Sequence, residues 1–309
     1  KNNLPPSKPL FQPRLFSTGL HGASVFVTGR RQAVLDAAVA DMRSCGVSTV
    51  AGIQGDVRKP EDVERWVRVA TAPASSSALD VLVNCAAGNF LAAADALSAN
   101  GFRTVLDIDA VGTFSTSRAA LPALKRAAER NGSGGGGGGG GASATSSSSS
   151  SPVIINISAT LHYGATWWQA HACAAKAAVD ALTRSLALEW GEFGVRVCGV
   201  APGPIAGTAG LSKLSGSGGK GDGIAEAIAA LVPLGRLGSA WDIAMACVWL
   251  SSAGSRFTSG DTLVVDGAAW LWRPPAVPRA VVAEVSRKVE AGSRAMTKVG
   301  AGAAAASRL

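Results

Sequence analysis

The sequence predicts an α/β fold, a doubly wound parallel sheet with helices on both faces, and two observations support that prediction. Short runs rich in valine and isoleucine alternate with longer segments rich in alanine and leucine. This is the pattern of strands buried on both faces and connected by crossover helices. A chain of 309 residues with 47% hydrophobic and 16% charged content can bury one large core. We therefore expect one domain with tails.

The expected elements follow one another in a regular order. Strands are expected at residues 24–29 (SVFVTG), 49–55 (TVAGIQG), 80–86 (DVLVNCA), 152–158 (PVIINIS), 195–201 (VRVCGVA) and 262–266 (TLVVD). Helices are expected at residues 31–43, 60–70, 101–130, 169–191 and 241–251. Because strands alternate with crossover helices, the strands should run parallel in a Rossmann-like sheet.

Three parts of the chain fall outside this pattern. Residues 1–21 should form an irregular N-terminal segment, residues 22–272 the Rossmann-like domain, and residues 273–309 a basic flexible tail. Residues 131–151 contain eight consecutive glycines and then six consecutive serines. Because these residues cannot bury apolar area, we expect a disordered insertion there.

Composition excludes several classes of protein. The net charge is +8, with much of the basic excess after Trp272, but that tail lacks the interleaved aromatic residues of a nucleic-acid binder. No run approaches the roughly 18 apolar residues of a membrane span, and the first residues are not those of a signal peptide. The five cysteines are scattered without CxxC spacing, so we expect reduced thiols and no metal site.

The last three residues suggest a compartment. Ser307-Arg308-Leu309 is a conservative variant of the SKL tripeptide that directs proteins to peroxisomes. The sequence thus predicts a peroxisomal location and the peroxisomal import receptor as a partner.

Four short motifs lie where open α/β sheets bind ligands. Residues 84–88 (NCAAG), 156–158 (NIS) and 202–204 (PGP) close three successive strands, and Lys176 lies in an alanine-rich helix between the last two. Alone, each could be an ordinary turn, a helix breaker or a surface charge. Together, in this order and spacing, they resemble the short-chain dehydrogenase/reductase family. The resemblance implies that Lys176 hydrogen-bonds the nicotinamide ribose hydroxyls.

The usual proton donors of that family are absent. Its tyrosine, four residues before the lysine, and its serine, seventeen before, are here Ala172 and Ala159. The usual alcohol/ketone chemistry therefore lacks its acid. Tyr163, His162 and His171 are nearby, but packing or surface roles are the simpler interpretation for each.

One group within the family, the peroxisomal reductases of 2,4-dienoyl-CoA thioesters, resembles this chain at the same positions. The likeness extends through residues 84–97, 105–114, 170–190 and 201–211. It implies that Asp109 is the catalytic acid, acting through an ordered water in a desolvated site; if Asp109 instead only braced its helix, Asp107 would be the alternative. NADPH would deliver hydride to carbon 5, and protonation of the dienolate at carbon 2 would give a 3-enoyl-CoA. No metal is required.

The resemblance also implies a set of binding residues. Arginines after the first strand favour the extra phosphate of NADP over NAD, although a surface pair at a helix start is the alternative. The implied cofactor residues are Arg30, Arg31, Asp56, Val57, Asn84, Ala86, Gly88, Lys176, Pro202, Gly203, Pro204, Ile205 and Thr208. The implied fatty acyl-CoA residues are Arg58, Phe90, Ser98, Asn100 and Lys213.

One departure from the family concerns the start of the fold. Members begin with a strand and a TGxxxGxG loop, whereas residues 1–22 carry four prolines, which argue against a central strand. Without that strand the sheet should be split, with no glycine loop for the pyrophosphate. We therefore expect a fragment of a longer reductase, or a homologue without activity, with poor NADPH binding and marginal stability.

Three functions remain open at this point. The leading one is an NADPH-dependent 2,4-dienoyl-CoA reductase. The alternatives are a short-chain reductase acting on another acyl-CoA or carbonyl, and a non-catalytic Rossmann-like homologue. By resemblance alone, a homotetramer is expected.

Overall fold

The computed structural model describes residues 19, 22–72, 77–132, 151–208, 222–279, 281–282 and 284–292. The chain divides into two compact units, Lys1–Trp270 and Leu271–Leu309, and each is described by itself. The expected residues Lys213 and Ser307-Arg308-Leu309, and most of the glycine/serine insertion, lie outside the described residues.

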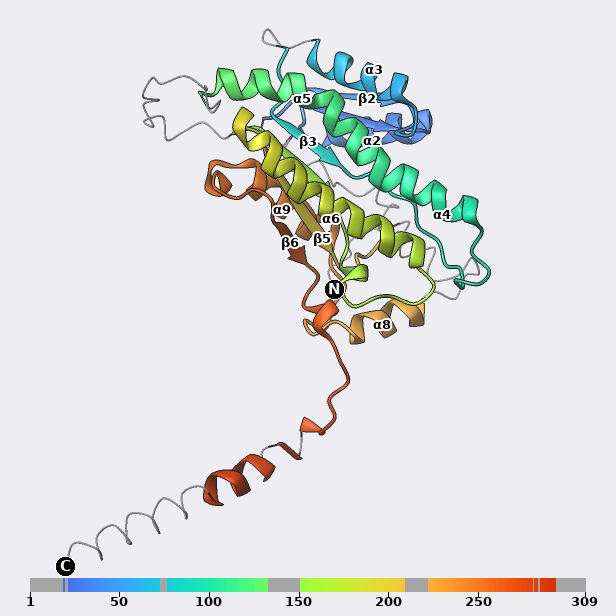
Figure 1. Ribbon diagram of the computed structural model, residues 1–309, viewed down its shortest axis with the longest axis vertical. Helices are drawn as coiled ribbons and strands as arrows, with labels where there is room; N and C mark the ends of the chain where they lie inside the picture. Colours follow the sequence, from blue (N-terminus) through green and yellow to red (C-terminus); the bar gives the residue numbers. More distant parts are fainter. Residues whose placement is uncertain are drawn as a thin grey trace, which may run out of the picture. The chain divides into compact units, whose positions relative to one another are not determined.

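The first unit alternates strands and helices (Figure 1). Its strands are β1 (Val25–Gly29), β2 (Val50–Gln54), β3 (Val81–Asn84), β4 (Val153–Ile157), β5 (Arg196–Pro202) and β6 (Thr262–Val265). Its helices are α2 (Gln32–Ser44), α3 (Pro60–Thr71), α4 (Ala99–Leu106), α5 (Gly112–Arg130), α6 (Ala170–Trp190), α8 (Asp222–Ala230) and α9 (Ala240–Ser251). Short helical turns are η1 (Asp107–Val111), η2 (Thr160–His162), η3 (Gly191–Phe193), η4 (Ala253–Ser255) and η5 (Ala269–Leu271). All six expected strands and four of the five expected helices are confirmed to within two residues at each end. The fifth, residues 101–130, has nearly the expected limits but is interrupted by η1, and α8 was not expected.

The strands are parallel but form two sheets. The larger has the order β3-β4-β5-β6, and β1 pairs with β2 in a separate two-stranded sheet. Within the described part of the chain, β2 is the sole ladder partner of β1 and β4 that of β3. Among the described residues, the strands therefore form two separate sheets, as expected.

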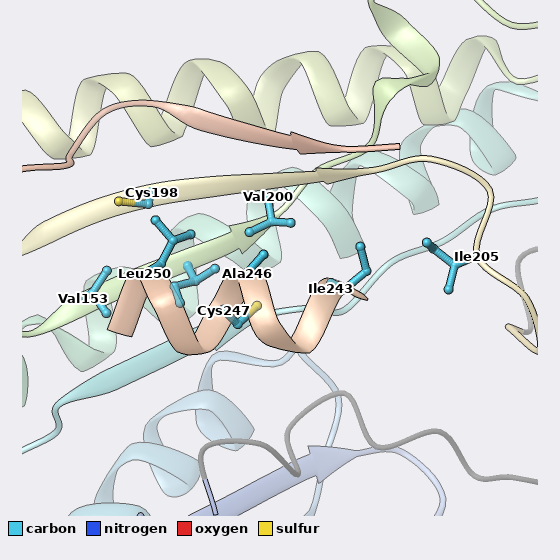
Figure 2. Close-up of a cluster of buried hydrophobic side chains, with 9 residues drawn as sticks. Val153, Cys198, Val200, Ile205, Ile243, Ala246, Cys247 and Leu250 are labelled. Carbon is cyan, nitrogen blue, oxygen red and sulfur yellow. The ribbon is translucent and has the colours of Figure 1, made fainter. Parts of the chain in front are cut away.

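The core of the larger sheet has two faces, because alternate residues of a strand point to opposite sides. Val153 and Ile155 of β4 pack with Cys198 and Val200 of β5 against α9, as Figure 2 shows for most of this cluster. On the other face, Ile154 and Val197 pack against α5 and α6 through residues such as Leu124 and Leu186. The nearly continuous apolar runs of β4 and β5 follow from this double burial.

One helical stretch departs from expectation. Residues 101–130 were expected to form a plain helix, but the stretch from Ala99 to Arg130 contains the π-helical turn η1 between α4 and α5. The backbone stays helical through both junctions. A π turn inside an α-helix often marks a functional site. Here it contains Asp107 and Asp109.

The second unit is partly helical. Residues 279, 281–282 and 284–292 are helical, and Lys288 Nζ donates a hydrogen bond to Glu284 Oε1. The expected flexible tail thus includes a helical segment. Across the described residues of both units, no helix is long and apolar enough to cross a membrane.

Candidate active site

A buried chain of polar side chains joins the ends of β3 and β4 to the helices behind them. Asn84 Nδ2 donates to Asn156 Oδ1 and to Ser117 Oγ, each at 2.9 Å. Asn156 Nδ2 in turn donates to Thr183 Oγ1 at 3.0 Å. Because buried amides are stable only when hydrogen-bonded, this network fixes where the two strands end relative to α5 and α6.

Asp109 lies at the centre of the site. Its side chain is fully buried, and its Oδ1 accepts a hydrogen bond from the backbone N–H of Gly88 at 2.6 Å. Lys176 Nζ lies 3.1 Å from Asp109 Oδ2 and donates to the backbone carbonyl of Ile157 at 2.9 Å. The structure therefore brings together the two expected catalytic residues, from η1 and α6, at the ends of β3 and β4.

The neighbouring acid, Asp107, is placed differently. It is only half-buried, and its charge contributes to raising the pKa of Arg58, after the larger effects of Asp56. Of the two candidates on η1, only Asp109 pairs with Lys176.

The first turn of α6 closes one side of the site. The ring of His171 stacks on Phe90 with centroids 4.2 Å apart, and Gln169 Nε2 donates to Asn89 Oδ1 at 3.0 Å. Ala172 is buried one turn before Lys176. The position of the missing tyrosine is thus filled by a methyl group, which supplies no proton.

Two expected binding residues pair with each other. Arg58 donates hydrogen bonds from its Nε and NH2 groups to the carboxylate of Asp56 at 2.5–3.2 Å. These bonds lower the pKa of Asp56 to about 2 and raise the pKa of Arg58. Val57 lies between them in the sequence and packs closely against the start of α5. A Cβ added at Gly112 would lie 2.8 Å from the side chain of Val57.

The arginines after β1 lie on the surface. Arg30 and Arg31 are exposed at the start of α2, so an anionic group can reach them. Ala86 is exposed and Gly88 half-buried just after β3.

The turn after β5 depends on a glycine. A Cβ at Gly203 would lie 2.5 Å from Asp266 Cβ, so Pro202, Gly203 and Pro204 pass very near the end of β6. Thr208 Oγ1 donates to the carbonyl of Ile205 at 3.0 Å. A cavity of about 230 Å³ borders this turn at Pro204 and Ile205. Because neither Asp109 nor Lys176 lines it, we do not assign the chemistry to this cavity.

The remaining substrate candidates lie at the start of α4. Ser98 and Asn100 are exposed, and Ser98 Oγ accepts the N–H of Gly101 at 3.0 Å as the helix N-cap. Ser98 thus has a structural role whether or not it contacts substrate.

Two features of the site had no signal in the sequence. Trp168 adopts a left-handed backbone with φ 58° and is largely exposed, a strained conformation for a bulky residue. His162 Nε2 lies 2.9 Å from Asp180 Oδ2, one helical turn beyond Lys176. Among the described residues, no group of histidine, cysteine and acidic side chains could hold a metal ion.

Comparison with known proteins agrees with this geometry. Residues 17–135 match the family described as short chain dehydrogenase, and residues 143–268 match the family described as enoyl-(acyl carrier protein) reductase. The chain is similar to a peroxisomal 2,4-dienoyl-CoA reductase of Arabidopsis thaliana, with 51% identity over 90% of this chain and 86% of the relative. It is 39% identical to the protein of the same name from Danio rerio, over 81% of this chain and 74% of the relative.

A solved structure supports the same assignment. A short chain dehydrogenase from Bacillus anthracis superposes with a TM-score of 0.66 at 30% identity, covering 85% of this chain and 92% of that one. The resemblance expected from the motifs is confirmed. The chain belongs to the short-chain dehydrogenase/reductase family.

Proposed function

We propose that this chain is an NADPH-dependent 2,4-dienoyl-CoA reductase that yields 3-enoyl-CoA in the β-oxidation of unsaturated fatty acids. The observation that carries the proposal is the buried Asp109–Lys176 pair beside Ala172. A site with a carboxyl group and no phenol suits protonation of a conjugated enolate, which needs only a weak acid, better than reduction of a ketone.

The described residues fit a nicotinamide dinucleotide at its two ends. Exposed Arg30 and Arg31 suit a 2′-phosphate, with Asp56 and Val57 beside the adenine. Lys176 would hold the nicotinamide ribose, and the ring would lie near Asn84, Ala86, Gly88 and the turn containing Pro202, Gly203, Pro204, Ile205 and Thr208. When bound, NADPH supplies the hydride for carbon 5 of the diene.

Asp109 and Lys176 of this chain carry out the proton transfer that follows. Asp109 delivers a proton through an ordered water to carbon 2 of the dienolate. The ammonium of Lys176, 3.1 Å away, stabilises the carboxylate that remains, because opposite charges attract strongly in a buried site. The hydrogen bond from Gly88 to Oδ1 keeps the carboxyl group oriented throughout.

Acyl-CoA would be bound beside this centre. Phe90 offers apolar contact to the acyl chain, Ser98 and Asn100 line the path at the start of α4, and Arg58 and Lys213 suit the phosphates of CoA. For Arg58 this means that the phosphate competes with Asp56.

The reaction is tested with a matched set of substrates. We expect NADPH oxidation with 2,4-decadienoyl-CoA and none with trans-2-decenoyl-CoA or a simple ketone. Only the conjugated diene gives a dienolate, which Asp109 can protonate through water. Equal turnover of the ketone would favour the alternative, a reductase of carbonyls or other acyl-CoA thioesters.

One observation favours the non-catalytic alternative. Among the described residues, no strand pairs with both β1 and β3, and no TGxxxGxG loop is present. NADPH binding should be followed by fluorescence titration on this chain and on one extended by an apolar strand and a TGxxxGxG loop. Binding by the extended chain alone supports a reductase whose pyrophosphate site needs that segment, whereas binding by neither supports a non-catalytic homologue.

The cellular setting is also part of the proposal. The relatives named above are peroxisomal by name, and Ser307-Arg308-Leu309 would bind the peroxisomal import receptor. A homotetramer, with α5 and α6 at the subunit contacts, is checked by light scattering.

A further inference from the structure

His171 is a buried polar side chain that the proposed reaction does not yet use. It lies in the first turn of α6, is fully buried, and stacks on Phe90. Neither ring nitrogen makes a hydrogen bond of good geometry among the described residues, and the only polar contact of the ring is a weak one with the backbone of Phe90. Since buried polar atoms are nearly always hydrogen-bonded, to protein or to ordered water, these two nitrogens indicate a ligand position.

Burial favours the neutral form of the ring. Burial lowers the pKa of His171, while the weak hydrogen bond to the backbone of Phe90 and the charge of Asp109 act in the opposite direction. The positive end of the helix dipole also disfavours a charged ring in the first turn of α6. A neutral imidazole carries one N–H donor and one acceptor nitrogen, so His171 can both give and receive a hydrogen bond.

Asp109 is the charged group that acts on this ring. The other ionisable residues on the elements packed against α6, and near His171 on α6 itself, are Asp107 on η1, Arg103 on α4, His162 on η2, Glu192 on η3, Arg196 and Cys198 on β5, and Cys173, Lys176 and Asp180 on α6. Of these and Asp109, only Asp109 contributes to the pKa of His171. Asp109 Oδ2 is likewise buried without a hydrogen bond of good geometry in the described residues, although Lys176 lies beside it.

We propose that His171 and Asp109 hold one ordered water between them, and that His171 is the positioning residue for the proton step. The proposal rests on the proposed function and adds to it the group that orients the water. Two buried groups with unsatisfied hydrogen-bonding atoms on facing elements give that water the two or more polar partners it needs.

The proton balance is simple. The water gives a proton to carbon 2 of the dienolate, forming the C–H bond, and the resulting hydroxide takes the proton of the Asp109 carboxyl group. The imidazole of His171 stays neutral and holds the oxygen of the water throughout. Solvent later returns a proton to Asp109.

The first test needs neither substrate nor cofactor. The chain has three histidines, so the imidazole signals can be resolved by ¹H–¹⁵N NMR and that of His171 assigned with His171→Gln. We expect the pKa of His171 to lie below the ordinary range of histidine. Because the charge of Asp109 raises this pKa, Asp109→Asn should lower it further. His162→Gln is the matched control and should leave the pKa of His171 unchanged. An Asp109→Asn variant with an unaltered His171 titration would overturn the proposal.

The second test isolates the proton step from hydride transfer. In D₂O without cofactor, the chain should exchange the carbon 2 protons of 3-decenoyl-CoA for deuterium, because that exchange needs only the dienolate and the water. His171→Phe keeps the stacking on Phe90 and should slow exchange about tenfold or more, within the range of acid–base catalysis, at an unchanged half-saturating concentration. His171→Gln keeps a donor and an acceptor and should retain more of the rate.

The outcomes separate the two proposals. Exchange by His171→Phe at the rate of the unmodified chain means that the ring only packs against Phe90, and overturns the inference. If the unmodified chain exchanges nothing, the substrate assignment fails and the NMR titration alone decides the role of His171. If His171→Phe fails to fold, the exchange rate and pH profile of His171→Gln decide it.

Discussion

Lys176 Nζ lies 3.1 Å from Asp109 Oδ2, although one residue is on a regular α-helix and the other on a π turn. Both side chains are buried, so Lys176 provides the main compensation for the carboxylate that Asp109 becomes when it gives up its proton. The pair is therefore a structural feature of the site as well as its proposed source of protons.

Replacing one partner should separate these two roles. We expect Asp109→Asn to reduce dienoyl-CoA turnover by about 10²–10⁴-fold, the usual contribution of a positioned acid. The loss of the buried pair should also cost up to about 3–5 kcal/mol of unfolding free energy. Steady-state kinetics and urea unfolding measure the two effects, with Asp107→Asn as the control. Greater loss of activity in the control would assign the acid to Asp107 instead.

The turn after β5 should not tolerate a side chain at position 203. Gly203→Ala would bring a Cβ to 2.5 Å from Asp266 Cβ, and we expect a loss of about 1–3 kcal/mol through overpacking. Gly191→Ala is the matched control, because its backbone is helical and nothing lies within 4 Å of a Cβ there. Equal unfolding midpoints in urea would show that this turn is not tightly packed.

Acid should weaken the link between Asp56 and Arg58. The pKa of Asp56 is lowered from 3.8 to about 2, mainly by the hydrogen bond from Arg58. A lowered carboxyl pKa contributes stability that is present above pH 3.8 and is lost as the pH falls towards about 2. Thermal unfolding over this window should be less pH-dependent in Arg58→Gln, and an unchanged slope would contradict the pairing.

The cysteines should differ widely in reactivity. Cys45 and Cys85 are exposed, whereas Cys198 and Cys247 are buried. Burial raises the pKa of Cys198, and it raises the pKa of Cys247 to about 12. Because the thiolate is the reacting form, thiol-specific labelling at neutral pH should modify Cys45 and Cys85 first. Rapid labelling of Cys247 would mean that the packing between α9 and β4 opens readily.

Sequence patterns predicted the fold where burial is uniform. The apolar runs of β4 and β5 predict strands because both faces are covered. The prolines before residue 22 predict a split sheet, and in the described residues β1 pairs with β2 alone. The family resemblance named Asp109 and Lys176 as the catalytic residues, and the structure places their side chains 3.1 Å apart. The stacking of His171 on Phe90 and the pairing of Arg58 with Asp56 were not predicted, because both depend on side-chain directions that periodicity does not encode.

The π turn could not be predicted for a different reason. The composition of residues 107–111 (DIDAV) does not distinguish a π turn from an ordinary α-helical turn. The same five residues are compatible with either backbone conformation. The choice between the two depends on what surrounds the helix.

The π turn η1 also makes the geometry of the site depend on the number of residues in the turn, which substitutions leave unchanged. A π turn accommodates one more residue than an α turn, and one residue corresponds to about 100° of rotation about a helix axis. Removing a single residue of η1 other than Asp109 would let α4 and α5 join as an uninterrupted α-helix that still contains Asp109. Asp109 would then rotate away from Lys176. A deletion of one residue would thus remove the proposed acid from the site while leaving the sheet intact.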